Sequence, residues 1–198
     1  MSGLGRRGIE KVKEIEKDKE IEANLQEEEE KNNKLLCLIK YIPTSTSSIF
    51  QPYPSLVLPQ LYLGSVQNSS SWEQISTLNI KKILNCAKEA PNLFVKKGVQ
   101  YMHLPLEDSN NEDIKRYFEE ATSFINSALK EGDAILVHCL AGRSRSATIC
   151  AAYLMMERKM SKEEAVEFIR KCRCTALASG YNYAFDFALE ELEDALQK

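Results

Sequence analysis

Long hydrophobic runs are missing from this sequence of 198 residues. No apolar stretch approaches the roughly 20 residues that a membrane-spanning helix requires, so we expect no membrane partner. Half of residues 1–20 are Lys, Arg or Glu, and this stretch contains no apolar core of a signal peptide. We therefore expect the chain to work in a reducing compartment, the cytoplasm or the nucleus.

An excess of positive charge is also missing, because the formal net charge is −3. This argues against nucleic acid as the main partner, and any anion site must be a local concentration of donors. In a reducing compartment the six cysteines are expected to be free thiols. Cys172 and Cys174 have no second pair of ligands nearby, so we expect no zinc site, no other metal and no cofactor.

The sequence divides into a charged extension, residues 1–54, and a compact domain, residues 55–198. Residues 8–34 are almost wholly charged or polar and predict a solvated helix, with a partner-binding helix as the alternative. Residues 43–54 are rich in Ser, Thr and Pro and predict a linker.

Strands alternate with helices in the compact domain, which predicts an α/β fold with a central, mostly parallel sheet flanked by helices. The apolar run 134–138 predicts a buried central strand, and the apolar stretch 148–156 a buried helix. The other predicted strands are 56–58, 61–64, 80–85 and 99–104, and the other predicted helices are 72–78, 117–129, 161–171 and 184–196.

Residues 137–148 read Val-His-Cys-Leu-Ala-Gly-Arg-Ser-Arg-Ser-Ala-Thr. The carboxyl ends of strands in an open α/β sheet present ligand-binding loops, and Cys139 stands at such an end. Because a helix is expected from Ser146, residues 139–145, here called the cysteine loop, must wrap its amino end. Free amides and the helix dipole favour an anion there, and Gly142 permits a backbone angle that other residues avoid. The cysteine loop is therefore a candidate anion site.

Arg145 adds to the cysteine loop a planar set of donors that matches two oxygens of a phosphate. Amides and a guanidinium around Cys139 favour the thiolate, which is the nucleophilic form of cysteine. Ser146 can donate a hydrogen bond to that sulfur and help it to leave later. A nucleophile beneath a phosphate site indicates phosphoryl transfer through a cysteinyl-phosphate. A buried structural cysteine, the alternative, would require none of these neighbours.

This pattern resembles the protein tyrosine phosphatase superfamily, and in detail the dual-specificity phosphatases, whose loop commonly runs His-Cys-x-x-Gly-x-Ser-Arg-Ser. The resemblance extends over about residues 55–198 and implies a metal-free hydrolase of phosphorylated proteins. It implies that His138 orients the loop, that Cys139 is the nucleophile and that the loop holds the phosphate. The implied phosphate-binding residues are Leu140, Ala141, Gly142, Arg143, Ser144 and Arg145.

Expulsion of an alcohol or phenol oxygen requires an acid near the leaving atom, and the sequence has only two histidines. Residues 104–113, the acidic loop, follow a predicted strand and can overhang the cysteine loop. The resemblance implies an aspartate of this stretch as general acid and base. Asp108 fits best, with Glu107 as its rival, whereas Asp113 is expected to cap the next helix and Glu112 is a further candidate.

Two other functions remain open: a phosphoprotein-binding scaffold and a phosphatase of phosphoinositides. Relatives of the second kind tend to carry lysines where this loop has Leu140 and Ala141, which favours phosphorylated proteins; the resemblance implies mitogen-activated protein kinases among them. Cys86 could form a reversible disulfide with Cys139, as in some relatives. The pattern departs from the family where Arg-Pro gives way to residues 172–176 and where Pro is replaced by Tyr181.

Overall fold

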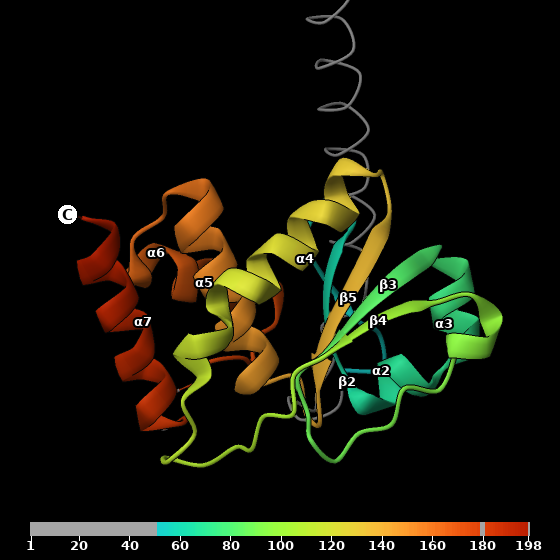
Figure 1. Ribbon diagram of the computed structural model, residues 1–198, viewed down its shortest axis with the longest axis horizontal. Coiled ribbons are helices and arrows are strands. Elements are labelled where there is room, and N and C mark those ends of the chain that lie inside the picture. Colours follow the sequence, from blue (N-terminus) through green and yellow to red (C-terminus); the bar gives the residue numbers. More distant parts are fainter. Residues whose placement is uncertain (1–50, 179–180, 198) are drawn as a thin grey trace, which may run out of the picture. The chain divides into compact units, whose positions relative to one another are not determined.

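The computed structural model describes residues 51–178 and 181–197 (Figure 1). All of them belong to the compact unit Ser47–Lys198. The extension predicted for residues 1–54, with its alternative of a partner-binding helix, lies almost wholly outside the described residues, and the boundary at residue 55 stays a prediction. Within the described part of the chain, no helix is long and apolar enough to cross a membrane.

Five strands form one sheet in the order β1-β2-β5-β3-β4. β1 runs antiparallel to β2, whereas the other neighbouring pairs are parallel. Val137 of β5 pairs with Leu63 on one side and with Leu84 on the other, and β5 is buried throughout, as an apolar central strand should be. The strands are β1 (Ser55–Leu58), β2 (Leu61–Ser65), β3 (Ile80–Asn85), β4 (Gln100–His103) and β5 (Ala134–Cys139).

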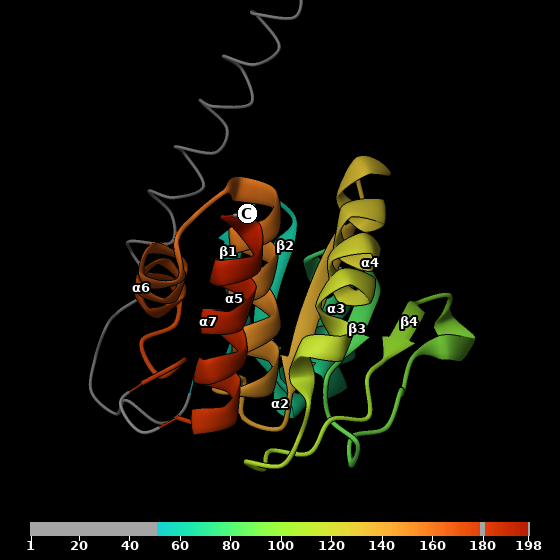
Figure 2. The same ribbon diagram turned by 60° about the vertical axis from the view of Figure 1, so that its left-hand side comes forward.

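Helices cover both faces of the sheet: α4 to α7 lie on one side, and α2 and α3 on the other (Figures 1 and 2). α5 is buried along most of its length because it packs against β5 and against its neighbours α4, α6 and α7. This position explains why its sequence is apolar on nearly every face. The helices are α2 (Val66–Ser70), α3 (Trp72–Thr77), α4 (Phe118–Lys130), α5 (Arg145–Arg158), α6 (Lys162–Cys172) and α7 (Tyr183–Leu196), with 3₁₀ turns at Val95–Lys97 and Ile114–Tyr117.

Successive side chains of β5 enter different cores. Ile135, Val137 and Cys139 belong to the core shared with α4 and α5, whereas Leu136 packs with Ile75 of α3 on the opposite face. This alternation is the ordinary period of two residues in a strand. It places the Cys139 side chain on the α5 side, where the next helix begins.

The predicted α/β fold with a mostly parallel sheet is confirmed, and β3 has the predicted bounds. α5 begins at Arg145, one residue before the predicted Ser146. Asp113 occupies the cap position of the 3₁₀ turn, as expected, but its side chain makes no capping hydrogen bond there. α2 was not predicted, because its five residues, Val-Gln-Asn-Ser-Ser, are too few to show a helical periodicity.

Candidate active site

The cysteine loop lies at the edge of the sheet where parallel strands end. Cys139 is the last residue of β5, and the segments that follow the neighbouring β3 and then β4 bring Glu89 and Asp108 to it. The carboxyl ends of parallel strands meet at one edge, which explains why segments far apart in sequence gather here.

Cys139 is a free thiol with only 1% of its surface exposed. Its Sγ accepts a hydrogen bond from the backbone amide of Gly142 at 3.3 Å and one from the Ser146 hydroxyl at 3.2 Å. Both donors stabilise negative charge on the sulfur. The arrangement therefore suits a thiolate.

Gly142 occupies a position that only glycine fits. Its φ is +67°, and a Cβ there would lie 2.5 Å from the carbonyl oxygen of Gly64 in β2. The first residue of α2, which follows β2 directly, holds the cysteine loop at a second point, because the amide of Val66 donates to the carbonyl of Leu140 at 3.1 Å. A side chain at position 142 would push the loop away from β2.

The amino end of α5 is left open for an anion. Ser144 is at the cap position, but its hydroxyl donates to Oδ1 of Asp108 at 2.9 Å instead of capping the helix. No acidic residue stands in the first turn of α5. The amides at the start of this helix can therefore bind a ligand, and the helix dipole favours a negative one.

Arg145 is fastened to the protein by one edge of its guanidinium. Its NH1 donates to a carboxylate oxygen of Glu89 at 2.9 Å and to the carbonyl of Leu106 at 3.0 Å. Its Nε is buried without a hydrogen-bond partner among the described residues, and Oδ2 of Asp108 lies 3.7 Å from it. The Nε edge is thus the part of this side chain left for a ligand.

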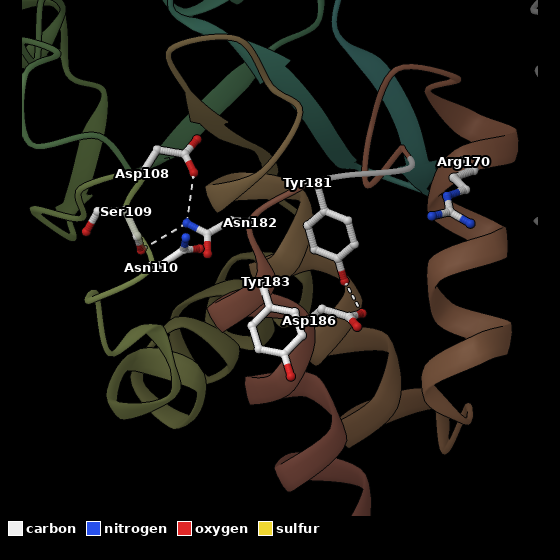
Figure 3. Close-up of a pocket in the computed structure, with 8 residues that line it drawn as sticks. All are labelled: Asp108, Ser109, Asn110, Arg170, Tyr181, Asn182, Tyr183 and Asp186. Atoms are coloured by element: carbon white, nitrogen blue, oxygen red, sulfur yellow. Dashed lines mark hydrogen bonds between the residues drawn. The ribbon is translucent and has the colours of Figure 1, made fainter.

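Asp108 is held by two elements. Besides the Ser144 hydroxyl, the side-chain amide of Asn182 donates to its Oδ1 at 3.2 Å and to the carbonyl of Ser109 at 2.9 Å (Figure 3). The carbonyl oxygen of the Asn182 side chain meanwhile caps α7, accepting from the amide of Ala184 at 3.0 Å. Asn182 therefore ties the acidic loop to the start of α7.

The neighbouring carboxylates of the acidic loop have other partners. Glu107 pairs with Lys88 at 2.6 Å, and the hydrogen bond and charge of Lys88 lower the pKa of Glu107. Glu112 accepts from the backbone amide of Glu107 at 2.9 Å and from Arg116 at 3.3 Å. In the part of the chain that the structure describes, Asp108 is the carboxylate of the acidic loop that bonds to the cysteine loop.

Behind the cysteine loop lies the segment 173–177, here called the backing segment. Nε of Arg173 donates to the carbonyl of Gly142 at 2.9 Å, and the amide of Leu177 donates to the carbonyl of Arg143 at 2.8 Å. This segment overlaps residues 172–176, which replace the Arg-Pro of related sequences. The departure from the family pattern therefore touches the loop itself.

His138 is wholly buried beneath the cysteine loop. Its Nδ1 lies 3.4 Å from the carbonyl oxygen of Cys139, and its own carbonyl accepts from the amide of Cys86 at 2.7 Å. Burial lowers the pKa of His138 to about 4, so the ring is neutral at pH 7.

The low pKa of His138 predicts a loss of stability in mild acid. His138 takes up a proton near pH 6.5 in the unfolded chain but only near pH 4 in the folded chain. The stability that the neutral ring contributes to the folded state is therefore complete above pH 6.5 and is lost as the pH falls toward 4. We expect the free energy of unfolding to drop over this interval by up to about 3 kcal/mol more in the wild type than in His138→Gln. Urea unfolding at pH 7 and pH 4.5 measures this, and an equal drop in both proteins would contradict it.

The other cysteines near the site are not set up as nucleophiles. Burial, together with negative charge on Cys139, raises the pKa of Cys86, so its thiol is neutral at pH 7. Burial likewise raises the pKa of Cys172 to about 11. A disulfide between Cys86 and Cys139 stays a prediction. Within the described residues, no group of three or more His, Cys, Asp or Glu lies close enough to hold a metal ion.

A cavity of about 780 Å³ adjoins the site at Asp108 (Figure 3). Of its two tyrosines, Tyr181 donates through its hydroxyl to Asp186 at 2.6 Å, whereas Tyr183 is 74% exposed. Tyr183 is therefore free to meet the ring of a ligand, and Tyr181 is committed to packing. The cavity is lined by Asp108, Ser109, Asn110, Arg170, Tyr181, Asn182, Tyr183 and Asp186.

Three side chains that contact the site were not predicted to do so: Glu89, Arg173 and Asn182. Glu89 follows the end of β3, so the rule that ligand loops follow strand ends could have drawn attention to it. The contacts of Arg173 and Asn182 join α6 and α7 to loops more than 30 residues away in sequence. No local pattern signals contacts of that kind.

The chain matches the family model described as the dual specificity phosphatase catalytic domain over residues 61–194. This match covers most of the chain and includes both the cysteine loop and the acidic loop. The protein belongs to this family.

Named relatives agree with this assignment. Dual specificity protein phosphatase 1-A of Xenopus laevis is 42% identical over 131 residues, which cover 66% of this chain and 35% of the relative. The chain thus spans about a third of the length of the curated relatives it matches. The structure is similar to that of human DUSP28, with a TM-score of 0.70, 31% identity and coverage of 77% of this chain and 100% of that one. A mouse dual specificity phosphatase complexed with zinc tungstate gives 0.69 at 29% identity, covering 78% and 95%.

Proposed function

We propose that this protein is a phosphatase that hydrolyses phosphotyrosine and phosphoserine or phosphothreonine in proteins through a cysteinyl-phosphate. The observation that carries the proposal is the surroundings of Cys139. Its sulfur accepts two hydrogen bonds and lies beneath an open helix end, with the Nε edge of Arg145 unpartnered among the described residues. Membership of the family supports the phosphatase class.

In the first step the thiolate of Cys139 attacks the phosphorus, and the bond from phosphorus to the leaving oxygen breaks. The loop amides and the guanidinium of Arg145 stabilise the charge that develops on the phosphoryl oxygens. Asp108 gives its proton to the leaving oxygen, which departs as an alcohol or phenol. The product that stays behind is a phosphate ester of the cysteine sulfur.

In the second step a water molecule attacks the phosphorus of the cysteinyl-phosphate. Asp108, now a carboxylate, takes a proton from this water. The sulfur–phosphorus bond breaks and inorganic phosphate leaves, while Ser146 donates its hydrogen bond to the departing sulfur. Cys139 returns to the thiolate, and the cycle needs no metal ion.

Phosphorylated proteins are the proposed substrates, with mitogen-activated protein kinases included on the family resemblance alone. The cysteine loop offers Leu140, which is 39% exposed, and Ala141 where a polyanionic inositol phosphate would call for cations. A substrate with a single phosphate on a protein side chain suits this loop better.

The test is release of inorganic phosphate from an aryl phosphate and from three peptides of one sequence that carry phosphotyrosine, phosphoserine or phosphothreonine. We expect release from the aryl phosphate and from the peptides, in the presence of a metal chelator, well above that of a blank without protein. Binding of the peptides without release would instead favour the scaffold. Release from inositol phosphates alone would favour the lipid phosphatase.

A further inference from the structure

The backing segment binds three consecutive carbonyls of the cysteine loop. Arg173 donates through Nε to Gly142 at 2.9 Å and through NH2 to Ala141 at 3.2 Å. The amide of Leu177 donates to the carbonyl of Arg143 at 2.8 Å. All three carbonyl groups therefore point toward the backing segment.

The direction of these carbonyls decides where the loop amides point. In a planar trans peptide the C=O and the N–H lie on opposite sides of the chain. The peptide that contains the carbonyl of Ala141 also contains the amide of Gly142, and this amide does donate to Sγ of Cys139, at 3.3 Å. By the same geometry the amides of Arg143 and Ser144 point away from the backing segment, toward the side where an anion would lie.

The backing segment is itself held in an unfavourable conformation. Leu177 has a φ of +47°, a region that residues other than glycine seldom adopt. Its carbonyl accepts from Nε of Arg170 at 2.7 Å, while its amide holds Arg143. Strain of this kind persists only where the surrounding structure fixes it, and it gathers at functional sites.

Arg173 also brings a buried positive charge close to Cys139. The residue is only 3% exposed, and its NH1 has no hydrogen-bond partner among the described residues. Burial lowers the pKa of Arg173, and negative charge on Cys139 acts in the opposite direction. Because an electrostatic interaction is mutual, a charged Arg173 favours the thiolate of Cys139. A buried charge of this kind is weak support for stability alone.

We propose that Arg173 is a positioning residue for the phosphate site: it turns the amides of the cysteine loop toward the ligand and favours the thiolate of Cys139 by its charge. This inference deepens the proposed function and rests on it. The Arg173 side chain would contribute in two ways: its planar set of donors orients the loop, and its charge favours the thiolate. Different substitutions of Arg173 can separate these two effects.

The experiment uses tungstate, a tetrahedral oxyanion, as the probe, and compares the wild type with Arg173→Met, Arg173→Lys and the control Arg158→Met at the exposed end of α5. Calorimetry gives the tungstate affinity. Mass spectrometry of the peptide that contains Cys139 gives the rate of its alkylation by iodoacetamide at pH 6. Neither readout requires turnover, and both are taken well below the melting temperature of each variant.

We expect Arg173→Met to weaken tungstate binding about tenfold or more and to slow alkylation of Cys139 several-fold, because it removes both donors and charge. Arg173→Lys keeps the charge but loses the planar set of donors that bonds the two carbonyls through separate nitrogens. Alkylation should therefore stay near the wild-type rate while tungstate binding weakens at least about threefold. Arg158→Met should change neither. If Arg173→Met does not fold, Arg173→Lys decides the question by its tungstate affinity.

Wild-type affinity and alkylation rate in the Arg173 variants, with only the melting temperature lowered, would overturn the inference and leave a structural role. Two further outcomes distinguish the proposed phosphatase activity from the positioning role of Arg173. A wild-type chain that releases no phosphate from any ester, but shows the expected shifts, would refute the phosphatase and retain Arg173 as a positioning residue of an anion site. A wild-type chain that binds no tungstate would refute both.

Discussion

Replacing Cys139 by serine is expected to lower phosphate release by at least about a thousandfold and to leave ligand binding within about threefold of the wild type. A serine hydroxyl is not ionised at neutral pH and cannot attack phosphorus as a thiolate does. It has nearly the same size as the thiol, however, and can still accept from the amide of Gly142 and the hydroxyl of Ser146. The anion site should therefore remain assembled.

The measurement pairs single-turnover phosphate release with calorimetric binding of a phosphotyrosine peptide. Cys37→Ser is the matched control, since it makes the same chemical change at a cysteine outside the compact unit Ser47–Lys198. Turnover retained in Cys139→Ser, or an equal loss in Cys37→Ser, would mean that Cys139 is not the nucleophile. Peptides that the serine variant captures and retains would identify substrates.

Asp108→Asn is expected to lower kcat for a phosphotyrosine peptide about 100- to 10,000-fold, which is the range that a positioned general acid contributes. An amide can still accept from Ser144 and lie near Arg145, but it has no proton to give to the leaving oxygen. The loss should be smaller for an aryl phosphate whose leaving group is a weak base, because that group departs without protonation. Steady-state kinetics on the two substrates measure the difference.

Glu107→Gln is the control for Asp108→Asn, since it makes the same change one residue away. The ion pair with Lys88 keeps the pKa of Glu107 low, so its carboxyl carries no proton at pH 7. We expect kcat within about twofold of the wild type. A large loss in Glu107→Gln and none in Asp108→Asn would transfer the role of general acid to Glu107.

The cysteine loop could be predicted from the sequence because it is contiguous. An apolar strand, a cysteine, a glycine that must adopt a positive φ, and an apolar helix follow one another within residues 134–158, and each has a local physical signature. The position of the acidic loop near the cysteine loop could be predicted for a similar reason, since the acidic loop follows a strand that ends at the same edge of the sheet. These features depend on neighbours in sequence and on the topology of a parallel sheet.

The side chains that hold the cysteine loop from outside were not predicted. Glu89 and Arg173 contact it across 56 and 31 residues of sequence. The place of Glu89 after a strand end was a usable signal, whereas the contact of Arg173 depends on how α6 packs and has no local signal. The strained conformation of Leu177 leaves no trace in composition, since leucine is an ordinary residue for a buried position. The hydrogen bond from the Ser144 hydroxyl to Asp108 at 2.9 Å, which joins the two loops, was likewise not predicted.

The cavity beside Asp108 offers inhibitors a second binding site next to the phosphate site. Its wall includes Asp108, which touches the cysteine loop, and Arg170, which holds the carbonyl of Leu177 (Figure 3). An uncharged compound bound there would contact both Asp108 and Arg170, which hold the cysteine loop and the backing segment, without occupying the phosphate site. Such a compound would avoid the double negative charge that keeps phosphate mimics from crossing lipid bilayers.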